Sequence, residues 1–200
     1  MNDAQPGAIV HVVDDDADLG QAVARLLARN GYRTCAFVSP AAMLAHHADA
    51  PAHCVVTDVM MGDTDGFALA QQLRACDAAA AIIFMTAWPT TANAVDAIRH
   101  YGGLDYLEKP IDEDRLIAAV AEGTAWSRRR RAALSRIEPL SPRERDVLAH
   151  LARGLSNKMV AAQLGLSPKT IEDHRAAIVA KTGIANAAGL IALMRDAQDG

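Results

Sequence analysis

The stretch His53-Cys-Val-Val-Thr-Asp58-Val-Met-Met-Gly-Asp-Thr-Asp-Gly66 begins with an apolar run, which ends on a carboxylate and passes into a polar turn. A short continuous apolar run is typical of a strand that is covered on both faces of a parallel sheet. Three other apolar runs are also followed directly by polar residues. These residues are Asp14-Asp15-Asp16, Thr86 and Lys109. The carboxyl ends of parallel strands meet at one edge of a sheet, so we expect these side chains to lie near Asp58.

The first part of the chain alternates between short apolar runs and helical patterns. We expect strands at Ile9–Val13, Arg33–Phe37, Cys54–Thr57, Ala81–Met85 and Asp105–Leu107. We expect helices at Ala17–Arg29, Pro40–His47, Gly66–Ala75, Thr91–Tyr101 and Asp112–Trp126. This order predicts a doubly wound α/β fold with a five-stranded parallel sheet.

The last part of the chain shows no strand pattern. Ser141-Pro142-Arg-Glu144 carries a capping-box signature, with a proline in the first turn of the helix that follows. We expect a small all-α domain of four helices over about 142–153, 157–164, 168–182 and 186–195. The two short helices joined by Gly165-Leu-Ser have the spacing of a helix-turn-helix.

Charge is distributed unevenly along the 200 residues, which carry a net charge of −4. Residues 1–123 hold 17 Asp and Glu against 7 Lys and Arg, whereas residues 124–200 hold 7 against 13. An acidic half joined to a basic half indicates two domains, of which the second faces a polyanion. We place the first domain at 1–126 and the second at 139–200. The basic segment 127–138 is a helix extension or linker, either a solvated connector or a segment that steers DNA.

Composition indicates a globular protein of the cytoplasm. No apolar run reaches the ~18 residues that a membrane span needs, and the N-terminus lacks the basic and apolar regions of a signal peptide. We interpret the cysteines as buried apolar side chains, because Cys35, Cys54 and Cys76 show no Cys-x-x-Cys spacing. The histidines other than His174, including His46-His47, lack metal-ligand spacing, and we assign them no role.

Each polar residue at the predicted sheet edge has a structural explanation when taken alone. Asp14-Asp15-Asp16 suits the N-terminus of a helix, and Asp58 can close an Asx-turn. Thr86 can be a strand-end hydroxyl, and the stem of Lys109 can cover apolar surface. Their joint placement at four strand ends favours a site for a divalent metal and a phosphoryl group.

These residues also resemble those of a known family. The motifs, in chain order, are Val13-Asp14-Asp15-Asp16, Thr57-Asp58-Val-Met60, Met85-Thr86-Ala87 and Lys109-Pro110. As an ordered set they resemble a response-regulator receiver domain over about residues 7–123. The resemblance implies a flavodoxin-like fold in which Asp58 accepts a phosphoryl group from a phosphohistidine on a sensor histidine kinase.

The same resemblance implies a metal site. Asp15, Asp58 and the backbone carbonyl of Met60 would bind Mg²⁺, with Asp14 in the outer shell. A divalent cation relieves the repulsion of crowded carboxylates, which agrees with this assignment. Gly62 stands where the family usually has proline, so we expect a looser loop after Asp58.

The resemblance further implies a switch. Thr86 and Lys109 would contact the phosphoryl oxygens, Thr86 would move toward the phosphoryl group and Tyr106 would rotate inward. The alternative for Tyr106 is a static, half-buried ring. The Lys109-Pro110 bond would be cis, and the face formed by the fourth and fifth helices and the fifth strand would form a homodimer.

The second half resembles a LuxR-type helix-turn-helix over about residues 139–196. The matching segments are Leu140-Ser-Pro-Arg-Glu-Arg-Asp-Val-Leu148, Gly154-Leu-Ser-Asn-Lys158 and Ser167-Pro-Lys-Thr-Ile-Glu-Asp-His174. The combination of the two halves resembles the NarL/FixJ family, nearer its FixJ branch.

The resemblance makes about Pro168–Lys181 the recognition helix. Its major-groove face would carry Lys169, Thr170, Glu172, Asp173, Arg175 and Ala176. Lys158, Lys169, Thr170 and Lys181 are better placed for phosphates, which position a protein without reading sequence. His174 is either a contact or an exposed residue that packs on the backbone, and Asp173 is either a solvated acid or a base contact.

We therefore expect a two-component transcription factor and not an enzyme, apart from assistance to its own phosphorylation and dephosphorylation. Phosphorylation of Asp58 would lead to a homodimer that binds promoter double-stranded DNA and contacts RNA polymerase, with no membrane partner. One alternative is a phosphorylation-independent regulator that uses the receiver only for dimerisation. Another is a hydrolase with an aspartyl-phosphate intermediate, but Met60 stands where such an enzyme would need a second acid.

Overall fold

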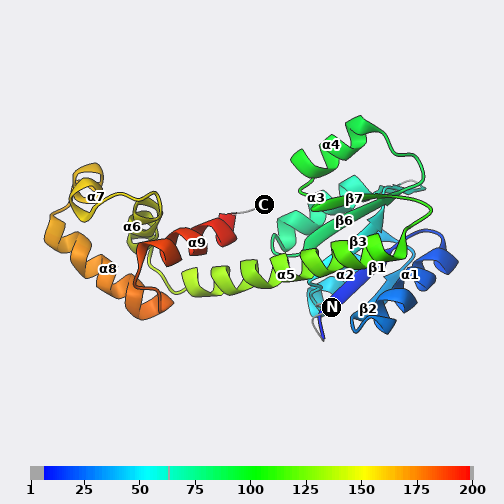
Figure 1. Ribbon diagram of the computed structural model, residues 1–200, viewed down its shortest axis with the longest axis horizontal. Helices are drawn as coiled ribbons and strands as arrows, with labels where there is room; N and C mark the ends of the chain where they lie inside the picture. Colours follow the sequence, from blue (N-terminus) through cyan, green and yellow to red (C-terminus); the bar gives the residue numbers. More distant parts are fainter. Residues whose placement is uncertain (1–6, 63, 199–200) are drawn as a thin grey trace. The chain divides into compact units, whose positions relative to one another are not determined.

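The computed structural model describes residues 7–62 and 64–198. The chain divides into two compact units, Met1–Arg128 and Arg129–Gly200 (Figure 1). The first unit contains a sheet and the second is helical. The helix α5 (Glu113–Ile137) crosses the boundary between them.

A parallel sheet with the strand order β2-β1-β3-β6-β7 forms the centre of the first unit (Figure 1). Its strands are β1 (Ile9–Val13), β2 (Arg33–Phe37), β3 (Cys54–Asp58), β6 (Ala81–Thr86) and β7 (Asp105–Glu108). The helices that join them are α1 (Ala17–Arg29), α2 (Pro40–Asp49), α3 (Gly66–Cys76) and α4 (Thr91–Arg99). The predicted doubly wound α/β fold is confirmed. The chain leaves β1 for β2 on one side and returns to β3 on the other, so the switch point lies between β1 and β3.

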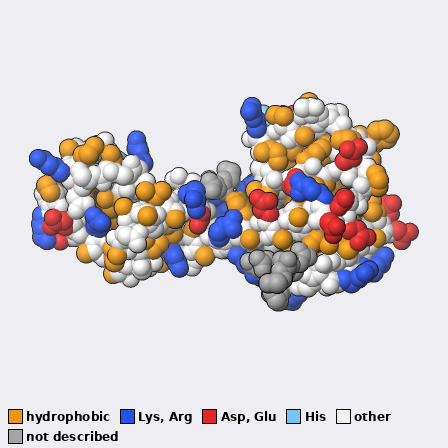
Figure 2. Space-filling view, in the orientation of Figure 1, with side chains coloured by type: hydrophobic (Ala, Val, Ile, Leu, Met, Phe, Trp, Pro, Cys, Tyr) orange, Lys and Arg blue, Asp and Glu red, His pale blue; other side chains and the backbone are white. Residues whose placement is uncertain are grey.

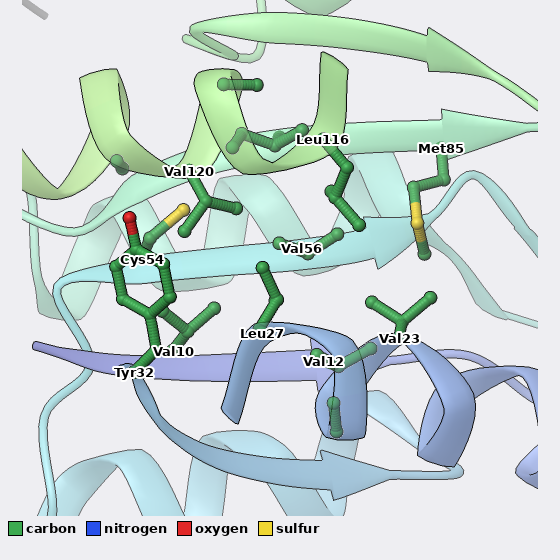
Figure 3. Close-up of a cluster of buried hydrophobic side chains, with 14 of the residues drawn as sticks. Val10, Val12, Val23, Leu27, Tyr32, Cys54, Val56, Met85, Leu116 and Val120 are labelled. Atoms are coloured by element: carbon green, nitrogen blue, oxygen red, sulfur yellow. The ribbon is translucent and has the colours of Figure 1, made fainter. Parts of the chain in front are cut away.

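Both faces of the sheet are covered, as the continuous apolar strands predict. Figure 3 shows Leu27 of α1 and Leu116 of α5 among Val10, Val12 and Val56, which project from one face of the sheet. The opposite face packs against α2, α3 and α4 through a second cluster that includes Val55, Ile82, Phe84, Leu69 and Met43. These two cores fix the ends of β1, β3, β6 and β7 relative to one another.

Two short strands, β4 (Met60–Met61) and β5 (Thr64–Asp65), form an antiparallel pair that the sequence analysis did not predict. Gly62 lies beside this pair with φ +56°. Proline cannot adopt a positive φ. The glycine therefore allows a left-handed turn at a position where the related family usually has proline.

The basic segment after Trp126 is helical as far as Ile137, so α5 contains nearly all of the expected linker. Arginine, alanine and leucine dominate this segment and have high helix propensity. The buried side chain of Ala133 joins the core of the second unit. Pro139 follows shortly after the helix, and a proline disfavours helical backbone in the residue before it.

The second unit contains α6 (Pro142–Ala152), α7 (Asn157–Leu164), α8 (Pro168–Thr182) and α9 (Ala187–Gln198). Its core includes Val147, Leu148, Val160, Ile171 and Ile178. Gly165 ends α7 with φ +65°, a conformation that glycine tolerates better than other residues. The predicted helix-turn-helix is therefore formed by α7 and α8.

Among the described residues, no single helix is long and apolar enough to cross a membrane. In the same described part of the chain, α8 and α9 reach the length and apolar composition of a span when they are counted together across a 65° bend.

The first helix of the second unit begins with a complete capping box. The Ser141 hydroxyl accepts a hydrogen bond from the Glu144 N–H at 3.3 Å, and the Glu144 carboxylate accepts one from the Ser141 N–H at 2.8 Å. We predict that Ser141→Ala lowers the free energy of unfolding of this unit by about 1 kcal/mol, because a backbone donor at the start of α6 loses its acceptor. Thermal unfolding of the full chain, followed by circular dichroism, measures this change.

Ser135→Ala is the matched control, because Ser135 is an exposed residue inside α5. Its effect should stay within about 0.5 kcal/mol. Equal effects of the two substitutions would show that the cap of α6 contributes nothing specific.

Candidate functional site

The carboxyl ends of β1 and β3 bring three carboxylates together. Asp58 is the last residue of β3, and Asp14 and Asp15 directly follow β1. One carboxylate oxygen of each lies within 4.8 Å of the others. Asp14 is only 1% exposed and Asp58 7%, whereas Asp15 is exposed. Buried carboxylates need a cation or hydrogen-bond donors to remain charged.

Lys109 supplies a cation to this cluster. It directly follows β7, and its Nζ donates to Asp58 Oδ2 at 2.6 Å and to Asp14 Oδ2 at 2.9 Å. Burial alone would lower the pKa of Lys109, but its hydrogen bonds to Asp58 and Asp14 outweigh burial and raise that pKa. Burial raises the pKa of Asp14 despite the contact with Lys109. Lys109 therefore remains charged and fixes the relative position of two acids from different strands.

Asp16, the third member of the acidic run, has a structural role. Its carboxylate accepts hydrogen bonds from the N–H groups of Asp18 and Leu19 at 3.0 and 3.1 Å, which makes it the N-cap of α1. An acid at this position also interacts favourably with the helix dipole. Of the three acids in this run, Asp16 is therefore the one that stabilises the start of the helix. Asp14 and Asp15 belong to the carboxylate cluster with Asp58.

The loop after Asp58 is held by backbone contacts. The Met60 N–H donates to Asp58 Oδ1 at 3.3 Å, and the Gly66 N–H donates to the Val59 carbonyl at 2.8 Å. A Cβ at Gly66 would lie 2.3 Å from the Asp58 carbonyl oxygen. Gly66 is therefore required by the close approach of α3 to the phosphoacceptor candidate.

Thr86 and Tyr106 lie on the neighbouring strands β6 and β7. Thr86 is 1% exposed, and its hydroxyl accepts a hydrogen bond from the Trp88 N–H at 3.1 Å. Tyr106 is half-buried and packs on the second core, and its hydroxyl is buried without a hydrogen-bond partner among the described residues. The Lys109-Pro110 bond is cis, as expected. The predicted movements of Thr86 and Tyr106 remain predictions.

The acidic cluster has the donor chemistry of a Mg²⁺ site. Magnesium prefers oxygen ligands and is bound in proteins through one or two carboxylates. Asp15 and Asp58 offer carboxylates, and Met60 offers a backbone carbonyl two residues after Asp58. Asp14 is engaged by Lys109, which suits an outer-shell position. The residues present therefore fit the expected metal.

The second unit presents α8 as its candidate DNA-binding helix. Lys169, Glu172, Asp173 and Ala176 are exposed, and Thr170, His174 and Arg175 are half-buried. Lys158 is exposed on α7. Figure 2 shows mostly Lys and Arg among the charged side chains on the visible face of this unit, and groups of Asp and Glu on that of the first unit.

Both lysines of α8 form ion pairs with carboxylates. Lys169 Nζ lies 3.2 Å from Asp173 and 3.6 Å from Glu172, and the hydrogen bond and charge of Asp173 raise the pKa of Lys169. Lys181 Nζ lies 2.7 Å from Glu144 on α6. A phosphate would therefore compete with a carboxylate at both lysines.

Arg175 and Thr170 also have partners within the unit. Arg175 contacts the Asn157 side chain at 3.5 Å, and the Thr170 hydroxyl lies 2.8 Å from that of Ser167, the N-cap of α8. The first contact ties Arg175 to the start of α7, and the second holds Thr170 at the start of α8. Their roles toward DNA, like those of the other residues of α8, stay predictions.

Comparison with known proteins places both units in families. Residues 10–121 match the response regulator receiver domain, and residues 138–194 match the bacterial regulatory proteins of the luxR family. The chain therefore belongs to the response regulators that join a receiver to a LuxR-type DNA-binding domain, and it is a transcriptional response regulator. The receiver implies a sensor kinase as partner, and the LuxR-type domain implies DNA binding.

Within this class the chain is a NarL/FixJ-family regulator near the FixJ branch. It is similar to the transcriptional regulatory protein FixJ of Azorhizobium caulinodans, with 38% identity over 91% of this chain and 89% of the relative. FixJ of Bradyrhizobium diazoefficiens is 36% identical over 86% of this chain and 87% of the relative. The crystal structure of full-length FixJ from B. japonicum has a TM-score of 0.55 and 32% identity, and covers 95% of this chain and 97% of that one.

Sequence reasoning found only part of the role of three residues that shape these sites. Gly66 was predicted only as the start of a helix, although a glycine directly after an acidic turn signals a close backbone approach. Asp16 carries the capping signal of an acid before a helical pattern. Glu144 was recognised in its capping box, but its ion pair with Lys181 depends on a contact between helices that no local pattern shows.

We predict that Gly66→Ala lowers the free energy of unfolding of the first unit by about 1–3 kcal/mol, the usual cost of overpacking. The new methyl group would force the Asp58 carbonyl and α3 apart. Chemical denaturation of the full chain measures the change. Gly20→Ala is the control, because its Cβ would meet Asp14 Cβ at an ordinary 3.5 Å. A Gly66→Ala protein as stable as the control would contradict the close approach.

Proposed function

We propose that Asp58 accepts a phosphoryl group from a phosphohistidine of a sensor histidine kinase, and that this reaction controls dimerisation and promoter binding. The observation that carries the proposal is the double contact of Lys109 with Asp58 and Asp14. In a chain whose other half is a LuxR-type domain, a lysine paired with two acids at the switch point of the sheet supports the role of Asp58 as the phosphoacceptor.

The reaction transfers one phosphoryl group between two nucleophiles. An Asp58 carboxylate oxygen attacks the phosphorus, the bond from phosphorus to the imidazole nitrogen breaks, and the histidine leaves with that electron pair. Lys109 exchanges its contact with Asp58 Oδ2 for a phosphoryl oxygen, where its charge stabilises the transition state. Thr86 donates a hydrogen bond from its hydroxyl to another phosphoryl oxygen, after the hydrogen bond that this hydroxyl accepts from the Trp88 N–H has broken.

Mg²⁺ belongs to this site, and when bound it neutralises charge on the phosphoryl oxygens. Asp15, Asp58 and the Met60 carbonyl would hold it, and Asp14 would act from the outer shell. Asp14 keeps Lys109 directed at the site, because their contact is buried and short. The protein thus assists its own phosphorylation and dephosphorylation, and is not an enzyme toward external substrates.

The phosphoryl group would be sensed through the loop and strand beside it. Thr86 moves toward the new oxygens, and Tyr106 settles further inward. These shifts would alter the face formed by α4, β7 and α5. Trp88, just before α4, exposes 75% of its surface. On α4 itself, Val95 exposes 43% and Ile98 46%. Exposed apolar side chains gathered on one face are typical of a protein interface. We therefore assign the interface of the phosphorylation-dependent homodimer to the face formed by α4, β7 and α5.

The dimer would present two α8 helices to paired half-sites in promoter DNA. Arg175 and Glu172 would contact base edges, while Lys158 and Lys169 would contact phosphates. The ion pair of Asp173 with Lys169 favours a solvated acid over a base contact. In the cytoplasm, the bound dimer would then contact RNA polymerase.

Mass spectrometry of the full chain after treatment with acetyl phosphate and Mg²⁺ tests the acceptor. We predict one phosphoryl adduct on Asp58, and none on an Asp58→Asn variant. Asp49→Asn, which changes an exposed acid of α2, should accept the group normally. Absence of an adduct on Asp58 would favour the alternative in which the receiver only dimerises. Phosphodonor-dependent dimerisation of Asp58→Asn would place the acceptor elsewhere.

We predict that Lys158→Ala weakens binding to all DNA sequences by a similar factor, because Lys158 is exposed on α7 and would contact a phosphate. The slope of log affinity against log salt should fall in magnitude by about one. Fluorescence anisotropy with specific and unrelated duplexes measures both effects. Arg195→Ala on α9 is the control and should keep the wild-type slope. A changed sequence preference in Lys158→Ala would instead indicate base readout.

A further inference from the structure

His11 is a histidine buried within the sheet of the first unit. It lies in the middle of β1, is 0% exposed, and neither ring nitrogen has a hydrogen-bond partner among the described residues. Burying a polar group without a partner costs about 1–3 kcal/mol in proteins. The ring nitrogens therefore offer unused ligand capacity inside the first unit.

His47, close by on α2, shows the contrasting case. Its Nε2 lies 3.0 Å from an Asp77 carboxylate oxygen, and its Nδ1 accepts the Ala52 N–H at 3.3 Å. Both nitrogens of this buried histidine are occupied, so His47 ties α2 to the end of α3 and is closed to a further ligand. The two rings lie 5.6 Å apart between centroids, in an edge-on arrangement.

Two other ligand-type side chains approach His11. Cys35 stands directly opposite His11 in the register of β1 with β2, so both side chains project from the same face of the sheet. His46, in the last turn of α2, covers that face, and its ring centroid lies 5.2 Å from that of His11. One ligand atom from each of His11, Cys35 and His46 lies within 4.8 Å of the other two.

This spacing is close to that of a metal centre. Zn–N bonds of about 2.0 Å and Zn–S bonds of about 2.3 Å place tetrahedral ligand atoms about 3.5 Å apart. His46 is exposed and Cys35 half-buried, so small side-chain rotations can close the difference, and an ion can enter from solvent. Burial, with the nearby His47 and His46, lowers the pKa of His11 to about 4, and its ring is therefore neutral near pH 7.

Two nitrogens and one sulfur select a different metal from the acidic cluster. Imidazole and thiolate suit borderline or soft ions such as Zn²⁺, whereas carboxylates suit Mg²⁺. Among the residues that the structure describes, only these two groups gather three such ligands. They use different residues, so one can be tested while the other is left intact.

We propose that His11, Cys35 and His46 bind a single borderline transition-metal ion such as Zn²⁺, on the face of the sheet that α2 covers. On binding, the Cys35 thiol releases its proton to solvent and a sulfur–metal bond forms. Water takes the remaining coordination position at the exposed side of His46. The ion would join β1, β2 and α2, and would give His11 the partner that it lacks. From the sequence we interpreted Cys35 as a buried apolar side chain and assigned His46 no role. The proposed site changes both interpretations, which were made because the spacing of these residues along the chain gives no sign of a metal site.

Cobalt titration of the full chain tests the proposal. Co²⁺ reports thiolate ligation through a charge-transfer band, and its ligand-field bands report the coordination geometry. Protein stripped with a chelator and kept reduced should bind one Co²⁺ with a charge-transfer band, and Zn²⁺ should displace it. Loss of a second-shell partner already costs about tenfold or more in metal affinity, so His46→Ala should lower Zn²⁺ affinity by at least that factor. Cys35→Ser should remove the charge-transfer band.

Matched controls are available on the same unit. Cys76→Ser and His100→Ala change an exposed cysteine and an exposed histidine, and should bind Co²⁺ like the wild type. Asp58→Asn should also keep the band, since it alters only the acidic cluster. His46 is exposed, so its substitution should leave the circular dichroism spectrum unchanged. A wild-type protein without the charge-transfer band, or His46→Ala and Cys35→Ser proteins with wild-type Zn²⁺ affinity, would overturn the proposal.

Discussion

The contact of Lys109 with Asp58 and Asp14 is the interaction on which the proposed function depends. It joins the ends of β7, β3 and β1, and it brings a lysine ammonium within 2.9 Å of two largely buried carboxylates. Two such acids would repel each other without a cation between them. In the proposed reaction the same lysine would turn to the phosphoryl group on Asp58, so the resting contact would also be the means by which the new charge is accepted.

The rest of the first unit keeps this edge in place. Apolar clusters on both faces hold the strands in register, and Gly66 lets α3 approach the Asp58 carbonyl. The buried surroundings of Asp58 contrast with the loop that contains Trp88 and leads into α4, where apolar side chains are exposed. In the proposed switch, a local change in charge at Asp58 would change this exposed surface without disturbing the core.

Sequence reasoning identified the elements whose signals are local. The apolar runs predicted all five strands of the sheet, and the serine caps predicted three of the four helices of the second unit, α6, α7 and α8. It could not supply contacts between segments that are distant in the chain, such as Lys181 with Glu144 or His11 with Cys35 and His46. It also expected every cysteine to be buried, whereas Cys76 is exposed and Cys35 is half-buried, because neither position reveals which face of its element is covered.

The central claim is that charge added at Asp58 strengthens DNA binding by α8. The most direct test is the affinity of the full chain for a target promoter, measured with and without acetyl phosphate and Mg²⁺, in the wild type and in Asp58→Asn. We expect tighter binding with the phosphodonor in the wild type only, with little change in Asp58→Asn. Equal affinity of the wild type in both conditions, or an equal gain in the variant, would contradict it.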